Sequence, residues 1–147
     1  ALSAFGPEAR IVVAELMAAV IAWNKGPLAG LADGGLADPR VDLREADVAQ
    51  VIADRPALYD AILLDVDNGP EGLTRAANDR LYDVRGLGAT FAALKPGGVL
   101  AVWSAGEDEK FTRRLRRAGF EVKIERVRAR GAKGGARHVI WMASRVA

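Results

Sequence analysis

Two carboxylates and an amide follow the most apolar segment of the chain, in the stretch YDAILLDVDNGP at residues 59–70. Asp65 ends the apolar run, and Asp67 and Asn68 follow directly before a Gly-Pro pair. These residue types favour turns, so they are consistent with a plain strand end. A carboxylate there can also bind a ligand and accept a proton, because open parallel sheets bind ligands at the carboxyl ends of their strands. The secondary structure predicted around this stretch helps to decide between a plain strand end and a ligand site.

Short apolar runs alternate with helical patterns along the chain, which predicts a mostly parallel α/β sheet. Apolar and β-branched runs predict strands over residues 10–16, 41–47, 59–66 and 99–104. Amphipathic or Gly/Pro-bounded runs predict helices over residues 17–26, 48–56, 78–94 and 107–119, with a loop over 27–40. Clean alternation on both sides of a glycine-rich turn predicts an antiparallel hairpin of residues 120–130 and 138–144. A doubly wound, Rossmann-like fold follows, in a single domain of residues 1–147.

The composition limits the kinds of site that the protein can contain. The 147 residues are 50% hydrophobic and include no cysteine, which excludes disulfides and thiolate metal sites. With His138 as the only histidine, we expect no metal centre, and Ser104 with His138 does not by itself make a catalytic triad. No apolar run reaches the roughly 20 residues that cross a bilayer. We therefore expect a cytoplasmic protein that does not bind membranes.

The small net charge of +2 conceals a basic C-terminal quarter. Residues 1–109 carry 9 Lys/Arg against 17 Asp/Glu, whereas residues 110–147 carry 12 against 2. Such a segment can bind an anionic partner, or it can solvate one helix and two strands. Arginines 126, 128 and 130 share one face of a predicted strand, but no aromatic residues alternate with them to stack on bases. We favour solvation and keep nucleic-acid binding as an alternative.

From RIVVAELM onward the order of features resembles the AdoMet-dependent methyltransferase fold and, within it, the spermidine synthase-like family. The landmarks are Glu15 at a strand end, DPRVDLREAD leading to Asp47, YDAILLDV reaching Asp65, and LKPGGVLAVWS. In such folds a glycine-rich turn lies about 20 residues before the ribose-binding acid. Counting back from Glu15 places that turn before the first residue. We therefore expect the first strand and its glycine loop to be missing, or replaced through a domain swap or an oligomer.

The resemblance implies S-adenosylmethionine, or its decarboxylated form, as the cofactor, and no metal. Glu15 would accept hydrogen bonds from the ribose hydroxyls, and Asp47 from the adenine amine. Leu16, Met17 and Val48 would pack against the adenine ring. Each polar residue also has a plainer use: Glu15 as a solvated acid at a strand end, and Asp47 as a helix N-cap. The apolar residues are equally consistent with a core.

Asp65 stands where the family's aminopropyltransferases carry the acid that binds and activates the attacking amine, close enough to the cofactor to contact it. The family typically shows an Asp-Ser-Ser-Asp-Pro-like run, whereas this chain has DVDNGP, with its second acid at a different spacing. The resemblance further implies that Asp67, Asn68, Tyr82 and Trp103 line the substrate pocket. Tyr82 and Trp103 are equally consistent with packing.

These observations predict an AdoMet-type transferase, and we favour methyl transfer to a small or amine substrate. One alternative is an aminopropyltransferase of polyamine synthesis that uses decarboxylated AdoMet. Another is a non-catalytic homologue or a nucleic-acid-binding protein. We expect the protein to act as a homodimer on a small-molecule substrate.

Overall fold

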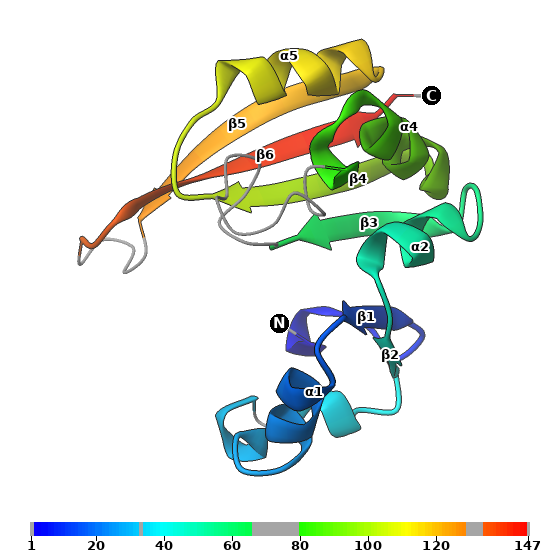
Figure 1. Ribbon diagram of the computed structural model, residues 1–147, viewed down its shortest axis with the longest axis vertical. Helices are drawn as coiled ribbons and strands as arrows, with labels where there is room; N and C mark the ends of the chain where they lie inside the picture. The colour runs from blue at the N-terminus through cyan, green and yellow to red at the C-terminus, as the bar shows by residue number, and fades with distance from the viewer. Residues whose placement is uncertain (1, 33, 66–79, 129–133, 147) are drawn as a thin grey trace. The chain divides into compact units, whose positions relative to one another are not determined.

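The computed structural model describes residues 2–32, 34–65, 80–128 and 134–146. The chain divides into two compact units, residues 1–51 and 52–147, and each is described by itself (Figure 1). Parallel strand pairs occur in both units and antiparallel pairs in the second, which confirms the α/β class and the C-terminal hairpin. The expected single domain stays a prediction. No helix of the described ranges is long and apolar enough to span a membrane.

The first unit is a two-stranded parallel sheet with short helices. Strand β1 (Ile11–Glu15) pairs with β2 (Val41–Glu45), and helix α1 (Ala18–Lys25) follows β1. The segment predicted as a loop contains two 3₁₀ turns, η2 (Ala29–Ala32) and η3 (Gly35–Ala37), and a third, η1 (Leu2–Ala4), opens the chain. Helix α2 (Val48–Ala53) begins after β2. Within 2–32 and 34–51, no side chain that the structure describes is fully buried.

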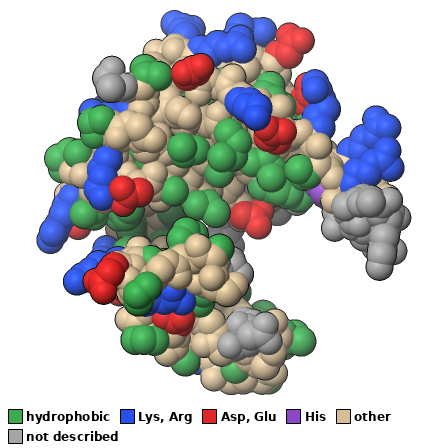
Figure 2. All heavy atoms as spheres, turned by 180° about the vertical axis from the view of Figure 1, so that it is seen from behind, with side chains coloured by type: hydrophobic (Ala, Val, Ile, Leu, Met, Phe, Trp, Pro, Cys, Tyr) green, Lys and Arg blue, Asp and Glu red, His purple; other side chains and the backbone are tan. Residues whose placement is uncertain are grey.

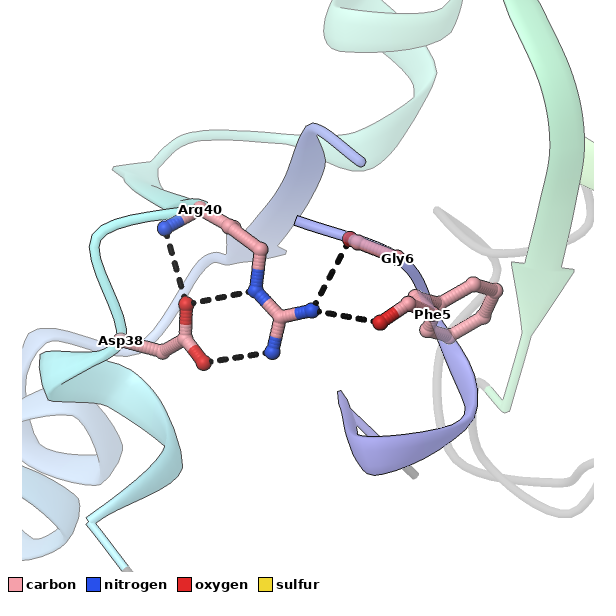
Figure 3. Close-up of polar contacts among 4 residues, drawn as sticks. All are labelled: Phe5, Gly6, Asp38 and Arg40. Atoms are coloured by element: carbon pink, nitrogen blue, oxygen red, sulfur yellow. Dashed lines mark hydrogen bonds and ion pairs between the residues drawn. The ribbon is translucent and has the colours of Figure 1, made fainter. Parts of the chain in front are cut away.

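Arg40 ties the start of β2 to the N-terminal turn (Figure 3). Its Nε and Nη2 donate to the two carboxylate oxygens of Asp38, over 2.9 and 2.7 Å. Its Nη1 donates to the carbonyls of Phe5 at 2.8 Å and Gly6 at 3.1 Å. A planar guanidinium can satisfy this many acceptors because its donors form a rigid fork. The hydrogen bonds that the side chain and the backbone amide of Arg40 donate to Asp38 lower the pKa of the Asp38 carboxyl to about 2.

The Asp38–Arg40 pair should make the stability of the protein depend on pH at the acid end. The folded-state pKa of about 2 lies below the ordinary value of 3.8, so the stabilisation is present above 3.8 and is lost as pH falls through 2. Asp38→Asn should remove this part of the dependence. We would compare urea midpoints between about pH 2 and pH 6. Asp42→Asn, which alters a more exposed pair with Arg44, is the control; identical curves for wild type and Asp38→Asn would contradict the expectation.

The second unit is a four-stranded sheet in the order β3-β4-β6-β5. Strand β3 (Tyr59–Leu64) is parallel to β4 (Leu94–Ser104), whereas β6 (Arg137–Arg145) runs antiparallel to both β4 and β5 (Phe120–Arg128). Helices α4 (Val84–Ala93) and α5 (Glu109–Arg117) lie on one face of this sheet (Figure 1). The strand predicted over 59–66 and the hairpin are therefore confirmed, with no end shifted by more than two residues.

The core of this unit lies between the sheet and the two helices. Leu100 and Val102 of β4 and Trp141 of β6 are completely buried, as are Phe111 and Leu115 of α5. The indole Nε1 of Trp141 donates to the Thr112 hydroxyl at 2.9 Å, and the ring meets Phe111 edge-on at 5.0 Å. Since a buried indole N–H needs an acceptor, this bond fixes where α5 packs on the sheet.

The opposite face of the same sheet is made by the intervening residues. Leu63 of β3 is 75% exposed, and Ala101, Trp103 and Met142 are half-buried. Strand residues alternate between faces, so the faces differ only because α4 and α5 cover one of them. No helix among the described residues of this unit buries the second face.

Two predicted boundaries differ from the structure. The strand expected to begin at residue 99 begins at Leu94, so LKPGG forms the start of β4, where Leu94 pairs with Tyr59 before a register shift. A glycine is required at Gly98, because a Cβ there would lie 2.9 Å from the Lys95 carbonyl oxygen. The helix expected over residues 78–94 is interrupted at Asp83: residues 80–82 are helical, and α4 begins at Val84 because the Asp83 carboxylate accepts from the Gly86 amide at 2.7 Å and caps it. The expected start at residue 78 lies outside the described residues.

Candidate functional site

Glu15 is the last residue of β1, and its carboxylate is partly committed to the turn that follows. Its Oε1 accepts from the Met17 amide at 2.7 Å. The second oxygen has no hydrogen-bond partner among the residues that the structure describes. A carboxylate oxygen also has two acceptor sites, so the group can still bind hydroxyl donors from a ligand.

The two apolar residues after Glu15 are exposed. Leu16 is 56% and Met17 45% accessible to solvent, so the structure does not place them in a core. Large apolar side chains at a strand end are suited to pack on the face of a flat ligand. The plainer interpretation of these two residues, as core, is not supported within this unit.

Asp47 lies between β2 and α2, and its Oδ1 accepts from the Ala49 amide at 2.8 Å. This bond confirms that Asp47 caps α2, while its Oδ2 has no hydrogen-bond partner in the described ranges. The Ala46 amide donates to the Glu15 carbonyl at 3.1 Å, which joins the ends of the two parallel strands. Glu15 and Asp47 therefore stand at one edge of the small sheet, and Val48 opens the helix beside them, half-buried.

An apolar cavity of about 320 Å³ adjoins Glu15 within the first unit. Strand residues Val13 and Leu43 and helix residue Val20 contribute to its wall, and of the residues that the structure describes, Glu15 is the one charged residue that lines it. A volume near 300 Å³ is at the lower end for small-molecule pockets. The cavity gives a carboxylate at the rim of an apolar space, which suits a ligand with a hydroxylated polar part and a flat apolar part.

In the second unit, Asp65 directly follows the last residue of β3 and is exposed. Leu64 pairs with Val102 in the parallel register, so Asp65 and Trp103 are the next residues along two neighbouring strands. Both continue the face that α4 and α5 leave open. Asp65 and Trp103 therefore lie on adjacent strands at the carboxyl edge of the sheet.

His138 joins this group, although it lies 35 positions after Trp103 in the sequence. Trp103 pairs with Ile140, and the rings of Trp103 and His138 are 4.7 Å apart at an angle of 33°. The His138 Nδ1 is buried without a hydrogen-bond partner among the described residues. His138 could not be placed in a site from the sequence, because its contact with Trp103 depends on the register between β4 and β6.

The other predicted substrate residues are placed differently. Tyr82 is 3% exposed and its ring packs edge-on against Phe111 at 5.6 Å, which puts it in the core beside α5. Its substrate role stays a prediction that this position does not favour. Asp67 and Asn68 lie outside the described residues. Within the described ranges, no group of three metal-binding side chains occurs.

No protein-family model and no curated protein matches this chain. Solved structures do match. Spermidine synthase from Thermotoga maritima aligns over 92% of the chain with a TM-score of 0.70 and 19% identity. A probable spermidine synthase from Corynebacterium glutamicum aligns over 97%, with a TM-score of 0.66 and 21% identity.

The chain has a spermidine synthase-like fold. The chain also matches the 1,6-didemethyltoxoflavin-N1-methyltransferase of Burkholderia thailandensis over 94% of its length, with a TM-score of 0.61 and 19% identity. That structure was solved with 1,6-didemethyltoxoflavin and S-adenosylhomocysteine bound. The predicted AdoMet methyltransferase-type fold is thereby confirmed. The chain spans 45%, 50% and 62% of these three proteins, in the order given.

Proposed function

We propose that the protein is an AdoMet-dependent transferase that methylates a small or amine substrate. The observation that carries this proposal is the exposed Asp65 at the carboxyl end of β3, next in register to Trp103. A carboxylate beside an aromatic ring can hold an amine and take its proton.

The residues of the first unit fit an adenosine group. Glu15 offers free acceptor sites for the ribose hydroxyls, and Asp47 keeps one oxygen for the adenine amine. Leu16 and Met17 are exposed at the same strand end and can pack on the ring. This combination of acceptors and apolar surface supports a nucleoside-containing cofactor, and it needs no metal.

The sulfonium group of AdoMet, when bound, supplies an electrophilic carbon. What the protein must add is an oriented, deprotonated nucleophile. Asp65 would accept the proton of the acceptor nitrogen as that nitrogen forms its new bond. Trp103, with His138 stacked on it, would hold the acceptor beside the carboxylate.

A second candidate function is aminopropyl transfer from decarboxylated AdoMet. The likeness to spermidine synthases favours it, including one solved in complex with the transition-state analogue AdoDATO, at a TM-score of 0.69 and 19% identity. The run DVDNGP argues against a diamine held by two acids at the family's spacing. We therefore place methyl transfer first. The homodimer and the cytoplasmic location stay predictions.

The test is calorimetric titration of the full-length natural protein with AdoMet, decarboxylated AdoMet and methylthioadenosine. Preferred binding of AdoMet, followed by methylated product from candidate amines, is the expected result. Preference for the decarboxylated form with aminopropylated product would establish the second function. Binding of none of the three would overturn both and leave a non-catalytic homologue.

Glu15→Gln should weaken cofactor binding by about 10- to 100-fold, the usual cost of losing one hydrogen bond to a charged group. The amide retains the oxygen that accepts from the Met17 amide, so the turn should be preserved. The dissociation constant from calorimetry measures the effect. Glu8→Gln, at an exposed position of the same unit, should leave it unchanged. Equal affinities for wild type and Glu15→Gln would remove Glu15 from the site.

A further inference from the structure

Two arginines face each other at the far end of the β5–β6 hairpin. Arg128 and Arg137 are direct partners in the antiparallel register, and both are exposed. Side chains in such positions have Cβ atoms about 4.5–5.5 Å apart, and like charges there destabilise the strand pair. Among the described residues, neither arginine has an ion pair.

The next arginine on the same face shows that the fold can neutralise such a charge. Arg126 is opposite Val139, and its Nε donates to the Glu107 carboxylate before α5. Arg128, two residues farther along β5, and its partner Arg137 have no such acid among the described residues. The repulsion between them is therefore confined to the end of the hairpin.

The hairpin also extends beyond the sheet at this end. Pairing between β4 and β6 reaches Val139, whereas pairing between β5 and β6 continues to Arg137. The last part of the hairpin is thus a two-stranded ribbon (Figure 1), and Lys and Arg side chains gather beside its tip (Figure 2). A two-stranded ribbon is narrow enough to enter the major groove of B-form DNA.

We propose that this end of the hairpin binds the phosphate backbone of duplex DNA through Arg128 and Arg137. The guanidinium fork matches phosphate oxygens, and a phosphate between the two arginines replaces their repulsion with attraction. Duplex DNA is favoured over single strands because no exposed aromatic side chain lies beside the two arginines on this face: Ile124 and Val139 precede them, and Trp141, farther along the same face, is completely buried. Trp103 and His138, which could stack on bases, lie on the opposite face.

The experiment measures fluorescence anisotropy of a labelled duplex with the full-length protein, without cofactor, across a range of salt concentrations. Arg128→Thr/Arg137→Thr should lower affinity by at least about tenfold at 0.1 M salt and reduce the salt slope by about two, because each phosphate contact contributes about 0.9 to that slope. Threonine suits a strand, so the fold should be kept. The urea midpoint should stay equal or rise, since the repulsion is removed.

The matched control is Arg116→Gln/Arg117→Gln at the end of α5, close to the start of β5 and thus at the opposite end of that strand. This variant removes the same charge and should keep most of the affinity. Equal losses for both variants would show a diffuse charge effect and overturn the assignment to the hairpin. No duplex binding by the wild type, or tighter binding of a single strand than of the duplex, would overturn it as well. Transfer activity on a small acceptor is a separate measurement, so either proposal can fail without the other.

Discussion

Asp65→Asn is expected to lower kcat/KM of the full-length protein by about 10²- to 10⁴-fold, the usual contribution of a positioned general base. Asparagine keeps the shape of the side chain but cannot accept the proton of the attacking amine. The carboxylate is exposed at the end of β3, so the substitution should leave the sheet intact. Initial rates with the acceptor found by product analysis measure the effect, and the cofactor dissociation constant shows that binding is kept.

Asp60→Asn is the matched control for this prediction. Asp60 is an exposed acid of the same strand, and it pairs with Lys95 at 2.7 Å rather than facing the carboxyl edge. Its replacement should leave kcat/KM within a factor of about two, because exposed ion pairs contribute little. Unchanged turnover in Asp65→Asn would remove Asp65 from the chemistry.

Trp141→Ala is expected to lower the free energy of unfolding by about 3–5 kcal/mol, the usual cost of truncating a buried tryptophan. Trp141 is completely buried, contacts Phe111 and donates to Thr112, so its removal leaves a cavity between the sheet and α5. Urea denaturation followed by circular dichroism measures the change. A loss below about 1 kcal/mol would contradict the described packing.

Two further variants separate the causes of that loss. Trp141→Phe keeps much of the volume but removes the hydrogen bond to Thr112, and should cost about 1–2 kcal/mol. Trp103→Ala removes a half-buried tryptophan of the same sheet and should cost less than Trp141→Ala. Equal losses of unfolding free energy in Trp141→Ala and Trp103→Ala would show that the two faces of the sheet are buried to the same extent.

Which of the two tryptophans, Trp103 or Trp141, is buried could not be predicted from the sequence. Each lies in an apolar strand with residues of both faces alternating around it, so pattern alone makes them equivalent. The structure separates them because α4 and α5 cover the face of Trp141 and leave that of Trp103 open. Which face a helix covers is decided by contacts between distant segments, such as the bond between Trp141 and Thr112.

In the basic C-terminal quarter as well, the sequence and the structure contribute different information. The count of arginines was available from the sequence, but their partners were not. Arg145 donates to the Leu94 carbonyl at 2.6 Å, Arg114 lies 3.5 Å from Asp108, and Arg126 pairs with Glu107. Once these pairs are known, Arg128 and Arg137 are recognised as two positive charges that face each other across the hairpin.

The strands, the hairpin and the acids near the strand ends could be predicted from the amino-acid pattern, because these features depend on local periodicity and on turn residues. Glu15 is the last residue of β1, Asp65 directly follows β3, and Asp47 lies two residues after the end of β2. The stacking of His138 on Trp103 and the packing of Tyr82 in the core became visible with the fold. Those contacts depend on strand register and helix packing, which are set by the summed energies of distant residues rather than by any short stretch of the chain.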